Sequence, residues 1–220
     1  MSVLTYQINH SQIYEVGAFI GGSNLVGDVG NTNFISPNQT AFGAVLKWNR
    51  SPRHSWRLSF VFSDIEAVDA RSNDPRRVER NLSLDESVFE VSGGLEYTFF
   101  DFNLHDSKTK YTPYLYSGIS ALNFQDFYFD NGTLISQGSS SWVVALPITL
   151  GVKGFFGRHF IIAAEVGARF AFTDALDGSE PTDNDLEEFE FGNINNNDWY
   201  VFSGITLTYT FGRKPCYCND

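Results

Sequence analysis

Apolar and polar residues alternate with a period of two along most of this chain. In the last alternating run, Leu207, Tyr209 and Phe211 share one face while three threonines share the other. Such alternation is typical of strands with one apolar and one polar face. We count eight runs of this kind, and only the fifth is ambiguous in its facing. They cover residues 14–20, 42–48, 56–63, 89–99, 112–124, 142–153, 160–172 and 199–211.

The composition agrees with strands. The 220 residues include 21 Phe, 10 Tyr and 19 Gly but a single Met, a balance that favours β-structure over helices. No segment approaches the roughly 20 consecutive apolar residues of a membrane-spanning helix. If the chain meets a membrane, it does so with strands.

The connections between the runs alternate in length. The links after the second, fourth and sixth runs are short, whereas those after the first, third, fifth and seventh are long and rich in Asn, Asp, Gly and Ser. Short turns at one end and long loops at the other are typical of outer-membrane barrels. We therefore predict an all-β fold, an eight-stranded antiparallel transmembrane β-barrel with short periplasmic turns and long external loops. The short links read NRSPRHS, DFNLHDSKTK and GFFGRH.

Alternation alone also fits a soluble barrel whose apolar face points inward. The positions of the aromatic residues favour the membrane, because they fall near strand ends, as interfacial girdles require. Barrel closure would also satisfy every backbone polar group, as lipid demands. The aromatic residues near strand ends are Trp48, Trp56, Phe99, Trp142, Trp199, Tyr209 and Phe211.

Charged residues on the face opposite the apolar one occur in equal numbers of each sign. Inside an eight-stranded barrel, which is just wide enough for side chains, these charges must pair or be hydrated. The balance predicts a plugged, ion-paired lumen and argues against a wide pore. The network consists of Glu15, Glu90, Glu96 and Glu165 with Lys47, Arg57, Lys153 and Arg169.

We divide the chain into a disordered start or signal remnant (1–12), the barrel (13–211) and a periplasmic tail (212–220). The start lacks the basic and apolar regions of a secretory signal. Either the protein stays inside the cell, or a signal has been replaced or lost upstream of about Gln12.

The net charge of −11 argues against a nucleic-acid partner, because phosphate binding needs a basic face. Acidic residues concentrate in residues 173–199, which we predict to be a solvated loop. This segment lacks the ligand spacing of a calcium loop, and we expect no metal, cofactor or small-molecule substrate. The histidines lie in the short turns and at the start, away from the long loops, so we predict no enzyme.

The only two cysteines, Cys216 and Cys218, lie beyond the last strand. They have too few residues between them for a usual zinc pair, and an internal link between them is at the geometric limit. The periplasm is oxidising, which favours paired thiols. The sequence leaves open a disulfide with a partner protein, a strained internal link and free thiols.

Six segments together resemble the PorG family of outer-membrane barrels, which belong to the type IX (Por) secretion and gliding machinery of Bacteroidota. The resemblance covers about residues 13–218, and KWNRSPRHS and FGRKPCYC are its most specific parts. Only the start departs from the family, which suggests a truncated or misassigned beginning. The segments are EVGAFIGGSNLVGDVG, KWNRSPRHSWR, EYTFFDFNLHD, TPYLYSGIS, AAEVGARFAFTDALDGS and NDWYVFSGITLTYTFGRKPCYC.

The resemblance implies a role that composition does not. It implies a non-enzymatic anchor that ties a periplasmic ring, built from a PorK-like lipoprotein and a PorN-like subunit, to the outer membrane and its lipid. The candidate contacts are the periplasmic turns and the tail, with Arg213, Lys214, Cys216, Tyr217 and Cys218. The alternative is a small transport or lipid-binding barrel.

Overall fold

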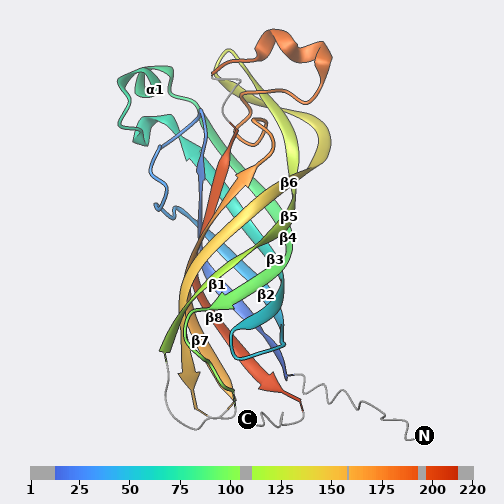
Figure 1. Cartoon of the computed structure of the whole chain (residues 1–220). Helices are drawn as coiled ribbons and strands as arrows, with labels where there is room; N and C mark the ends of the chain where they lie inside the picture. Colours follow the sequence, from blue (N-terminus) through green and yellow to red (C-terminus); the bar gives the residue numbers. More distant parts are fainter. Residues whose placement is uncertain (1–12, 105–110, 158, 193–196, 213–220) are drawn as a thin grey trace, which may run out of the picture.

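The computed structural model describes residues 13–104, 111–157, 159–192 and 197–212. Eight antiparallel strands form one closed barrel, in which each strand pairs with its neighbours in the sequence and the last pairs with the first (Figure 1). The predicted fold class is confirmed. The strands are β1 (Ile13–Val26), β2 (Gln39–Asn49), β3 (His54–Val68), β4 (Ser83–Thr98), β5 (Tyr111–Asp130), β6 (Thr133–Phe156), β7 (Phe160–Ala171) and β8 (Trp199–Phe211).

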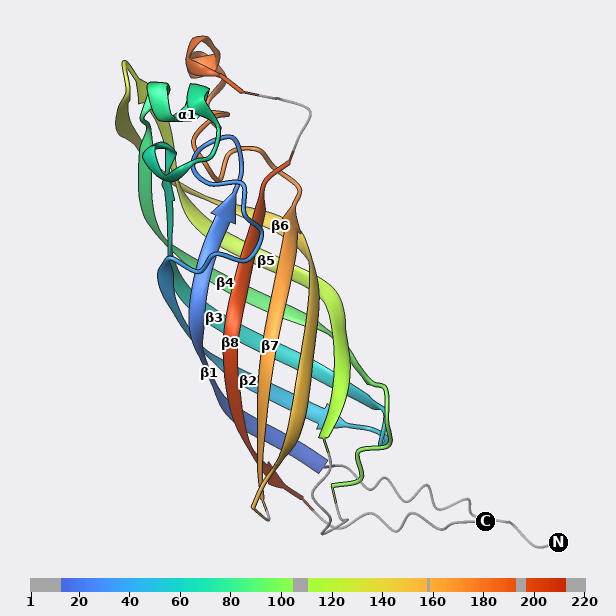
Figure 2. The same ribbon diagram turned by 90° about the vertical axis from the view of Figure 1, so that its left-hand side faces the viewer.

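The barrel closes along β1 and β8, which run side by side (Figure 2). Their register extends from Tyr14 opposite Phe211 to Val26 opposite Trp199. Because the ring is complete, no strand edge is left within the closed part of the wall, and lipid can surround it without meeting unpaired backbone groups.

Helical structure occurs only in the long connections of the described chain. A 3-10 turn, η1 (Asp69–Arg71), and a short helix, α1 (Pro75–Arg80), join β3 to β4. Another 3-10 segment, η2 (Asn184–Phe189), lies between β7 and β8. All three lie at the end of the barrel opposite the start of β1 and the end of β8 (Figure 1). In the part of the chain that is described, no helix has the length and apolarity to cross a membrane.

The connection between β5 and β6 differs from its prediction as a long loop. Both strands continue past the barrel wall and meet in a two-residue turn, Asn131–Gly132, whose φ angles are 48° and 81°. Positive φ at both positions matches the twist of a tight hairpin, and Asn-Gly is the dipeptide that adopts it most readily. The prediction was wrong because the Asn and Gly of this segment were counted as loop composition.

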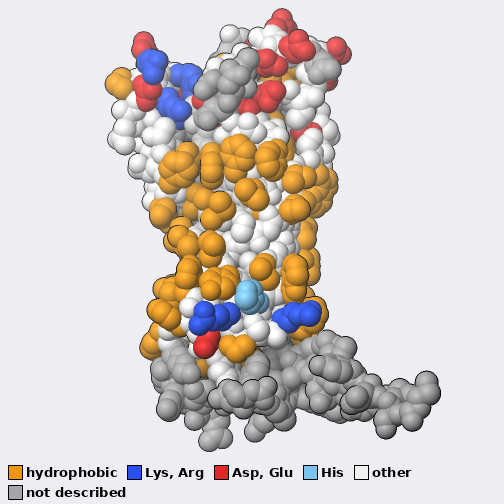
Figure 3. All heavy atoms as spheres, viewed as in Figure 1, with side chains coloured by type: hydrophobic (Ala, Val, Ile, Leu, Met, Phe, Trp, Pro, Cys, Tyr) orange, Lys and Arg blue, Asp and Glu red, His pale blue; other side chains and the backbone are white. Residues whose placement is uncertain are grey.

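The outer surface carries a belt of apolar side chains between charged groups at its two edges, as the face in Figure 3 shows. Alternate residues of the strands form this belt, and Ile20 in β1 is 70% exposed. On β5, Tyr114 and Tyr116 point inward and Ile119 points outward, which settles the ambiguous facing of the fifth run. An apolar exterior around a charged interior is the arrangement of a transmembrane barrel.

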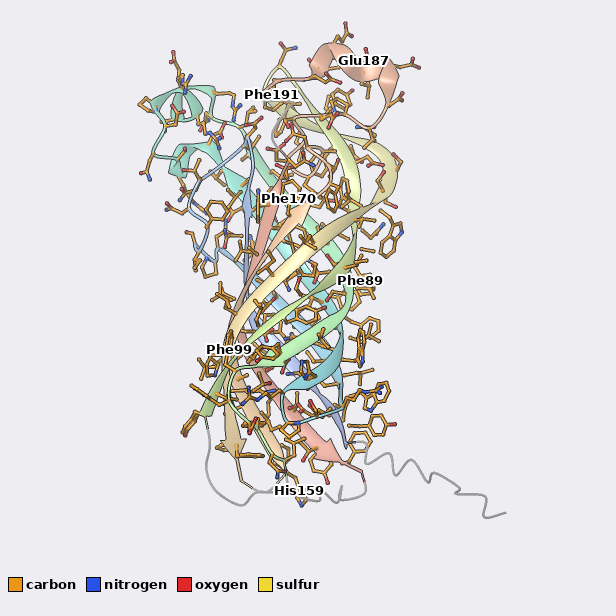
Figure 4. All side chains as sticks on the ribbon, viewed as in Figure 1. Phe89, Phe99, His159, Phe170, Glu187 and Phe191 are labelled. Carbon is orange, nitrogen blue, oxygen red and sulfur yellow. The ribbon has the colours of Figure 1, made fainter. Side chains whose placement is uncertain are left out.

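Two aromatic girdles border the belt. Near the loops, Phe62 stacks on Phe42 and Phe89, with ring centroids 6.0 and 4.4 Å apart; Phe89 points outward from the wall (Figure 4). Near the turns, Tyr14 stacks on Phe211 at 5.8 Å. Aromatic side chains that gather at two heights along the barrel axis mark the two membrane–water interfaces.

Candidate functional site

The barrel interior holds all eight charged residues of the predicted network. Each is buried, so the network has four carboxylates and four cations without contact with solvent. Strand alternation points these side chains inward, and closure brings residues of distant strands within reach of each other. The members are Glu15, Lys47, Arg57, Glu90, Glu96, Lys153, Glu165 and Arg169.

Glu96 is the centre of the network. Its two carboxylate oxygens lie 2.7 Å from Lys47 Nζ and 2.7 Å from Lys153 Nζ. Arg57 approaches the same carboxylate at 3.9 Å. One acid on β4 therefore joins cations from β2, β3 and β6 across the lumen.

Arg57 makes its closest contact with Glu165 on the opposite wall. Its Nη1 and Nη2 atoms donate to the two carboxylate oxygens at 2.8 and 2.7 Å. The Tyr114 hydroxyl also donates to Glu165. A bidentate guanidinium–carboxylate pair is the strongest geometry for such a contact, so this pair fixes the two walls relative to each other.

A third contact lies closer to the loops. Arg169 Nε lies 3.2 Å from Glu90 Oε2, and the Tyr200 hydroxyl donates to the same oxygen at 2.7 Å. The Arg169 guanidinium also lies over the Phe202 ring, 4.5 Å from its centroid. Cation–π contact of this kind is favourable in a desolvated site.

Glu15 departs from the expectation of ion pairing. It accepts hydrogen bonds from Asn49 Nδ2 at 2.7 Å and from Thr208 Oγ1 at 2.8 Å, which are neutral donors. The matched charge count therefore does not translate into four separate ion pairs, because two lysines share Glu96. Barrel tilt and register decide these partners, and neither can be read from alternation.

Apolar side chains fill the interior above the charged layer. Phe19, Leu122 and Phe202 belong to one buried cluster that continues upward to Leu176 in the loops. The Glu96 and Glu165 contacts thus occupy the lower part of the lumen, whereas in its upper part the Arg169–Glu90 contact lies among apolar side chains such as Phe202. Buried ion pairs and buried apolar side chains together argue against a wide aqueous path through the barrel.

Asp177 ties the first and last external loops together above this layer. Its carboxylate accepts hydrogen bonds from the backbone N–H groups of Asp28, Val29 and Ser179, the last two at 3.0 and 2.9 Å. Backbone N–H groups are donors that must be satisfied when buried. A buried acid thus replaces strand pairing where the chain leaves the sheet.

Asp69 performs the same task for the second loop. It accepts from Gly30 N at 2.8 Å, Leu82 N at 3.1 Å and Arg80 Nε at 2.8 Å. Arg77 adds two bonds to the carbonyl oxygens of Gly27 and Gly30. These contacts make the loops a cap over the barrel mouth.

Three aspartates form a buried carboxylate cluster under the cap. Asp174, Asp177 and Asp198 are 5%, 0% and 0% exposed. Among the described residues, nothing donates a hydrogen bond to either oxygen of Asp174 or to Asp198 Oδ1. Burial, reinforced by the neighbouring acids Asp177 and Asp28, raises the pKa of Asp174 to about 7. Burial and the same kind of repulsion raise the pKa of Asp198 well above its usual value.

Glu86, above the upper girdle, is also buried. Burial raises its pKa to about 8, and the nearby Asp126 adds to the shift while a bond from the Gln125 N–H opposes it. The upper part of the molecule thus holds several carboxyl groups that favour the protonated form near neutral pH.

The acidic segment 173–199 only partly matches its prediction as a solvated loop. Most described residues of 182–192 are exposed, and Glu187 lies at the tip of the molecule (Figure 4). Its earlier residues up to Ser179 are buried because Leu176 packs onto the apolar layer below. Across the ranges the structure describes, no group of three or more metal-ligating side chains is arranged to hold an ion.

The tail candidates Arg213, Lys214, Cys216, Tyr217 and Cys218 lie outside the described residues. The strand that leads to them ends at Phe211, at the end of the barrel with the short turns. His159 lies in a turn at this same end (Figure 4). The tail therefore starts from the face formed by these turns.

Sequence reasoning missed the neutral members of the network. Tyr114, Tyr200 and Asn49 each bind one of its carboxylates. Tyr114 was missed because the facing of the fifth run was ambiguous. The even spacing of Thr112, Tyr114 and Tyr116, all of which are buried, was the signal that could have revealed it.

A family model described as "Domain of unknown function (DUF6089)" matches residues 1–220. A comparison with curated proteins gives no match. Among solved structures, the N-terminal β-barrel domain of Pseudomonas aeruginosa OprF is 10% identical over 92% of this chain and 98% of its own, with a TM-score of 0.46. Neisserial surface protein A (NspA) is 11% identical over 91% and 97%, with a TM-score of 0.47. Ail of Yersinia pestis is 10% identical over 91% and 99%, with a TM-score of 0.45.

Proposed function

This chain belongs to the DUF6089 family, and we propose that it is a non-enzymatic outer-membrane barrel that anchors the periplasmic ring of a type IX (Por) secretion system. The ring would consist of a PorK-like lipoprotein with a PorN-like subunit. The support is the resemblance of six sequence segments to PorG-like barrels, together with the geometry of the two barrel ends.

The location follows from the physics of the exterior. A belt of apolar residues between two aromatic girdles suits the hydrocarbon core of a bilayer. With an even number of antiparallel strands, the start of β1 and the end of β8 lie on the same side of the membrane. In outer-membrane barrels the short turns face the periplasm. We therefore place the short turns, His159 and the start of the tail in the periplasm, and the cap outside the cell.

The observation that carries the proposal is that β8, the strand before the tail, ends at the same end of the filled barrel as the short turns. Ion pairs such as Arg57–Glu165 and the apolar layer above them occupy the lumen, so function falls to the surfaces. On the periplasmic side, the proposal assigns the contact with the ring to the short turns and to the chain that follows Gly212. A disulfide from Cys216 or Cys218 to a ring subunit would make the anchor covalent.

The first test is non-reducing electrophoresis with mass spectrometry of the protein gently purified from its native envelope. We expect an adduct with a periplasmic lipoprotein that reductant removes and that either Cys216→Ser or Cys218→Ser abolishes. A monomer band in every lane would overturn the covalent link. A chain truncated after Gly212 should no longer retain the ring. The matched control is the full-length chain with both Cys216→Ser and Cys218→Ser: if it still retains the ring, the tail acts by noncovalent contact, and if it also loses the ring, the attachment is covalent.

The transport alternative predicts current through the lumen. We expect a planar bilayer containing this protein to remain silent, because the ion-paired and apolar layers leave no continuous aqueous path. Discrete conductance steps from the folded protein, absent from a matched preparation of detergent alone, would favour transport.

A further inference from the structure

A pocket lies on the outer surface of the barrel at the periplasmic edge of the apolar belt. It has a volume of about 440 Å³ and is formed by the β2–β3 turn and the adjoining outward face of β3 and β4. Its lining changes from apolar to basic within one cavity. The lining residues are Arg50, Ser51, His54, Trp56 and Leu95.

The apolar wall belongs to the lipid-facing surface. Trp56 and Leu95 are direct cross-strand partners on β3 and β4, and they are 51% and 40% exposed. Side chains so exposed in this belt contact hydrocarbon once the barrel is in a bilayer. This wall therefore offers a surface for an acyl chain rather than for water.

The basic wall carries a cation, Arg50, that pairs with no carboxylate in the described part of the chain. Arg50 lies over the Trp48 ring at 5.9 Å, and no acid among the described residues pairs with it. The neighbouring Arg53 is different, because Asp101 lies 2.5 Å from its Nε. Of these two arginines in one turn, Arg53 is thus paired with a carboxylate among the described residues and Arg50 is not. Arg50 is the one that lines the pocket.

The turn itself is held in one shape. The N–H groups of Arg50 and Ser51 both donate to the carbonyl oxygen of His54, at 3.0 and 3.2 Å. Ser51 Oγ accepts from the N–H groups of Arg53 and His54. Its own hydrogen is then available for His54 Nδ1, 3.2 Å away, which leaves Nε2 as a hydrogen-bond donor.

We propose that this pocket binds an acidic phospholipid of the inner leaflet. The phosphate would accept hydrogen bonds from Arg50 and from His54 Nε2, while an acyl chain would lie against Trp56 and Leu95. Free phosphate would use only the basic wall, whereas a lipid uses both walls at the level where headgroups meet hydrocarbon. The face in Figure 3 shows basic side chains and a histidine along this edge of the belt. The inference needs the transmembrane placement but not the ring.

The test uses the full chain, stripped of lipid in detergent and titrated with phosphatidylglycerol while bound lipid is counted by native mass spectrometry. Arg50→Gln should weaken binding about fivefold, the scale of a partly exposed ionic contact. Arg53→Gln is the matched control, since it removes the same charge from the same turn outside the pocket, and its affinity should stay within about twofold. Arg50→Lys should retain most of the affinity.

Three outcomes would overturn the proposal. Equal losses in Arg50→Gln and Arg53→Gln would show attraction by net charge alone. Equal affinity of the wild type for phosphatidylcholine would show that the headgroup is not recognised. Full displacement of the lipid by glycerol phosphate at the affinity of the intact lipid would show that the apolar wall takes no part. Folding of each variant is verified by gel electrophoresis with and without heating, in which every variant should show the same mobility shift as the wild type.

Discussion

The two buried charge clusters of this barrel have the same degree of burial and opposite electrostatics. In the lumen, Glu96 lies within 2.7 Å of two lysines. Under the cap, Asp174 accepts no hydrogen bond from the described residues and has a pKa raised to about 7. Burial alone therefore does not fix the charge of a carboxyl group. Cations arriving from facing strands do so.

The difference follows from the architecture around each cluster. Closure of the strands aims side chains from all walls at one axis, so acids and bases of distant strands meet. The cap is built from loops that use carboxylates to satisfy backbone N–H groups, as Asp177 and Asp69 do. There the arginines bind loop carbonyls and Asp69 and do not reach Asp174.

The largest expected effect breaks the paired cluster. Glu96→Gln leaves Lys47 and Lys153 buried without their shared carboxylate. We expect the free energy of unfolding to fall by about 3–5 kcal/mol, as is usual when one partner of a buried pair is removed. Urea unfolding in lipid vesicles, followed by tryptophan fluorescence, measures this change.

The double variant Glu96→Gln, Lys47→Met is the control for that experiment. It removes one of the two stranded cations, so part of the loss should return. A single variant as stable as the wild type would contradict the assignment of Glu96 as the centre of the network.

A smaller effect is expected on the pH dependence of the stability of the cap, which contains the aspartate cluster of Asp174, Asp177 and Asp198. The pKa of Asp174 in the folded protein, about 7, lies above its ordinary value of 3.8. Asp174 therefore holds its proton more tightly in the folded than in the unfolded protein. The stabilisation that results is complete below the ordinary pKa of 3.8 and is lost as the pH rises through 7. Backbone hydrogen exchange of residues 174–179, corrected for its intrinsic pH dependence, should show a more stable cap at pH 5 than at pH 8.

Asp174→Asn tests the same group with nearly the same shape. At pH 8 we expect it to stabilise the cap by about 1–3 kcal/mol, the scale of a buried unsatisfied polar group. The difference should shrink as the pH falls toward 5 and should disappear only below the ordinary Asp174 pKa of 3.8. The matched control is Glu187→Gln in the exposed part of the same segment, which should leave the stability of the cap unchanged at both pH values. If Asp174→Asn and the wild type showed the same pH dependence of cap stability, the role of Asp174 would be contradicted.

The smallest effect concerns an ion pair outside both clusters. Glu66 Oε2 lies 2.9 Å from Arg71 Nη1 near the surface of the cap. Exposed pairs contribute only about 0.2–1 kcal/mol, so Arg71→Gln should change the urea midpoint little. A loss as large as that of Glu96→Gln would show that distance, rather than burial, controls the energy of these pairs.

The sequence predicted the parts of the structure that lipid imposes. A bilayer requires apolar residues at alternate positions and a closed ring of strands, so the outward faces of β6 and β7 and the girdle at Trp142 and Phe211 were readable. The burial of the eight charged residues on the inward face was readable for the same reason. In each case one strand alone contains the signal.

The features that depend on several strands at once could not be predicted. Glu15 binds Asn49 and Thr208 instead of a cation because register and tilt decide which side chains meet. The burial of Asp198 depends on loops that fold onto the apolar layer, and loop packing has no periodic signal. The Asn131–Gly132 turn was different, since its dipeptide carried a readable signal.

The seam between β1 and β8 has a consequence for the order of assembly. It pairs Tyr14 with Phe211, so the barrel wall cannot be completed until almost the entire barrel sequence has been synthesised. Contacts between such distant residues form slowly, and before they form the first and last strands each present an unpaired edge that invites aggregation. Each chain must therefore be kept from other chains until β1 and β8 meet, so an intact β8 is required before the exposed edge of β1 is covered.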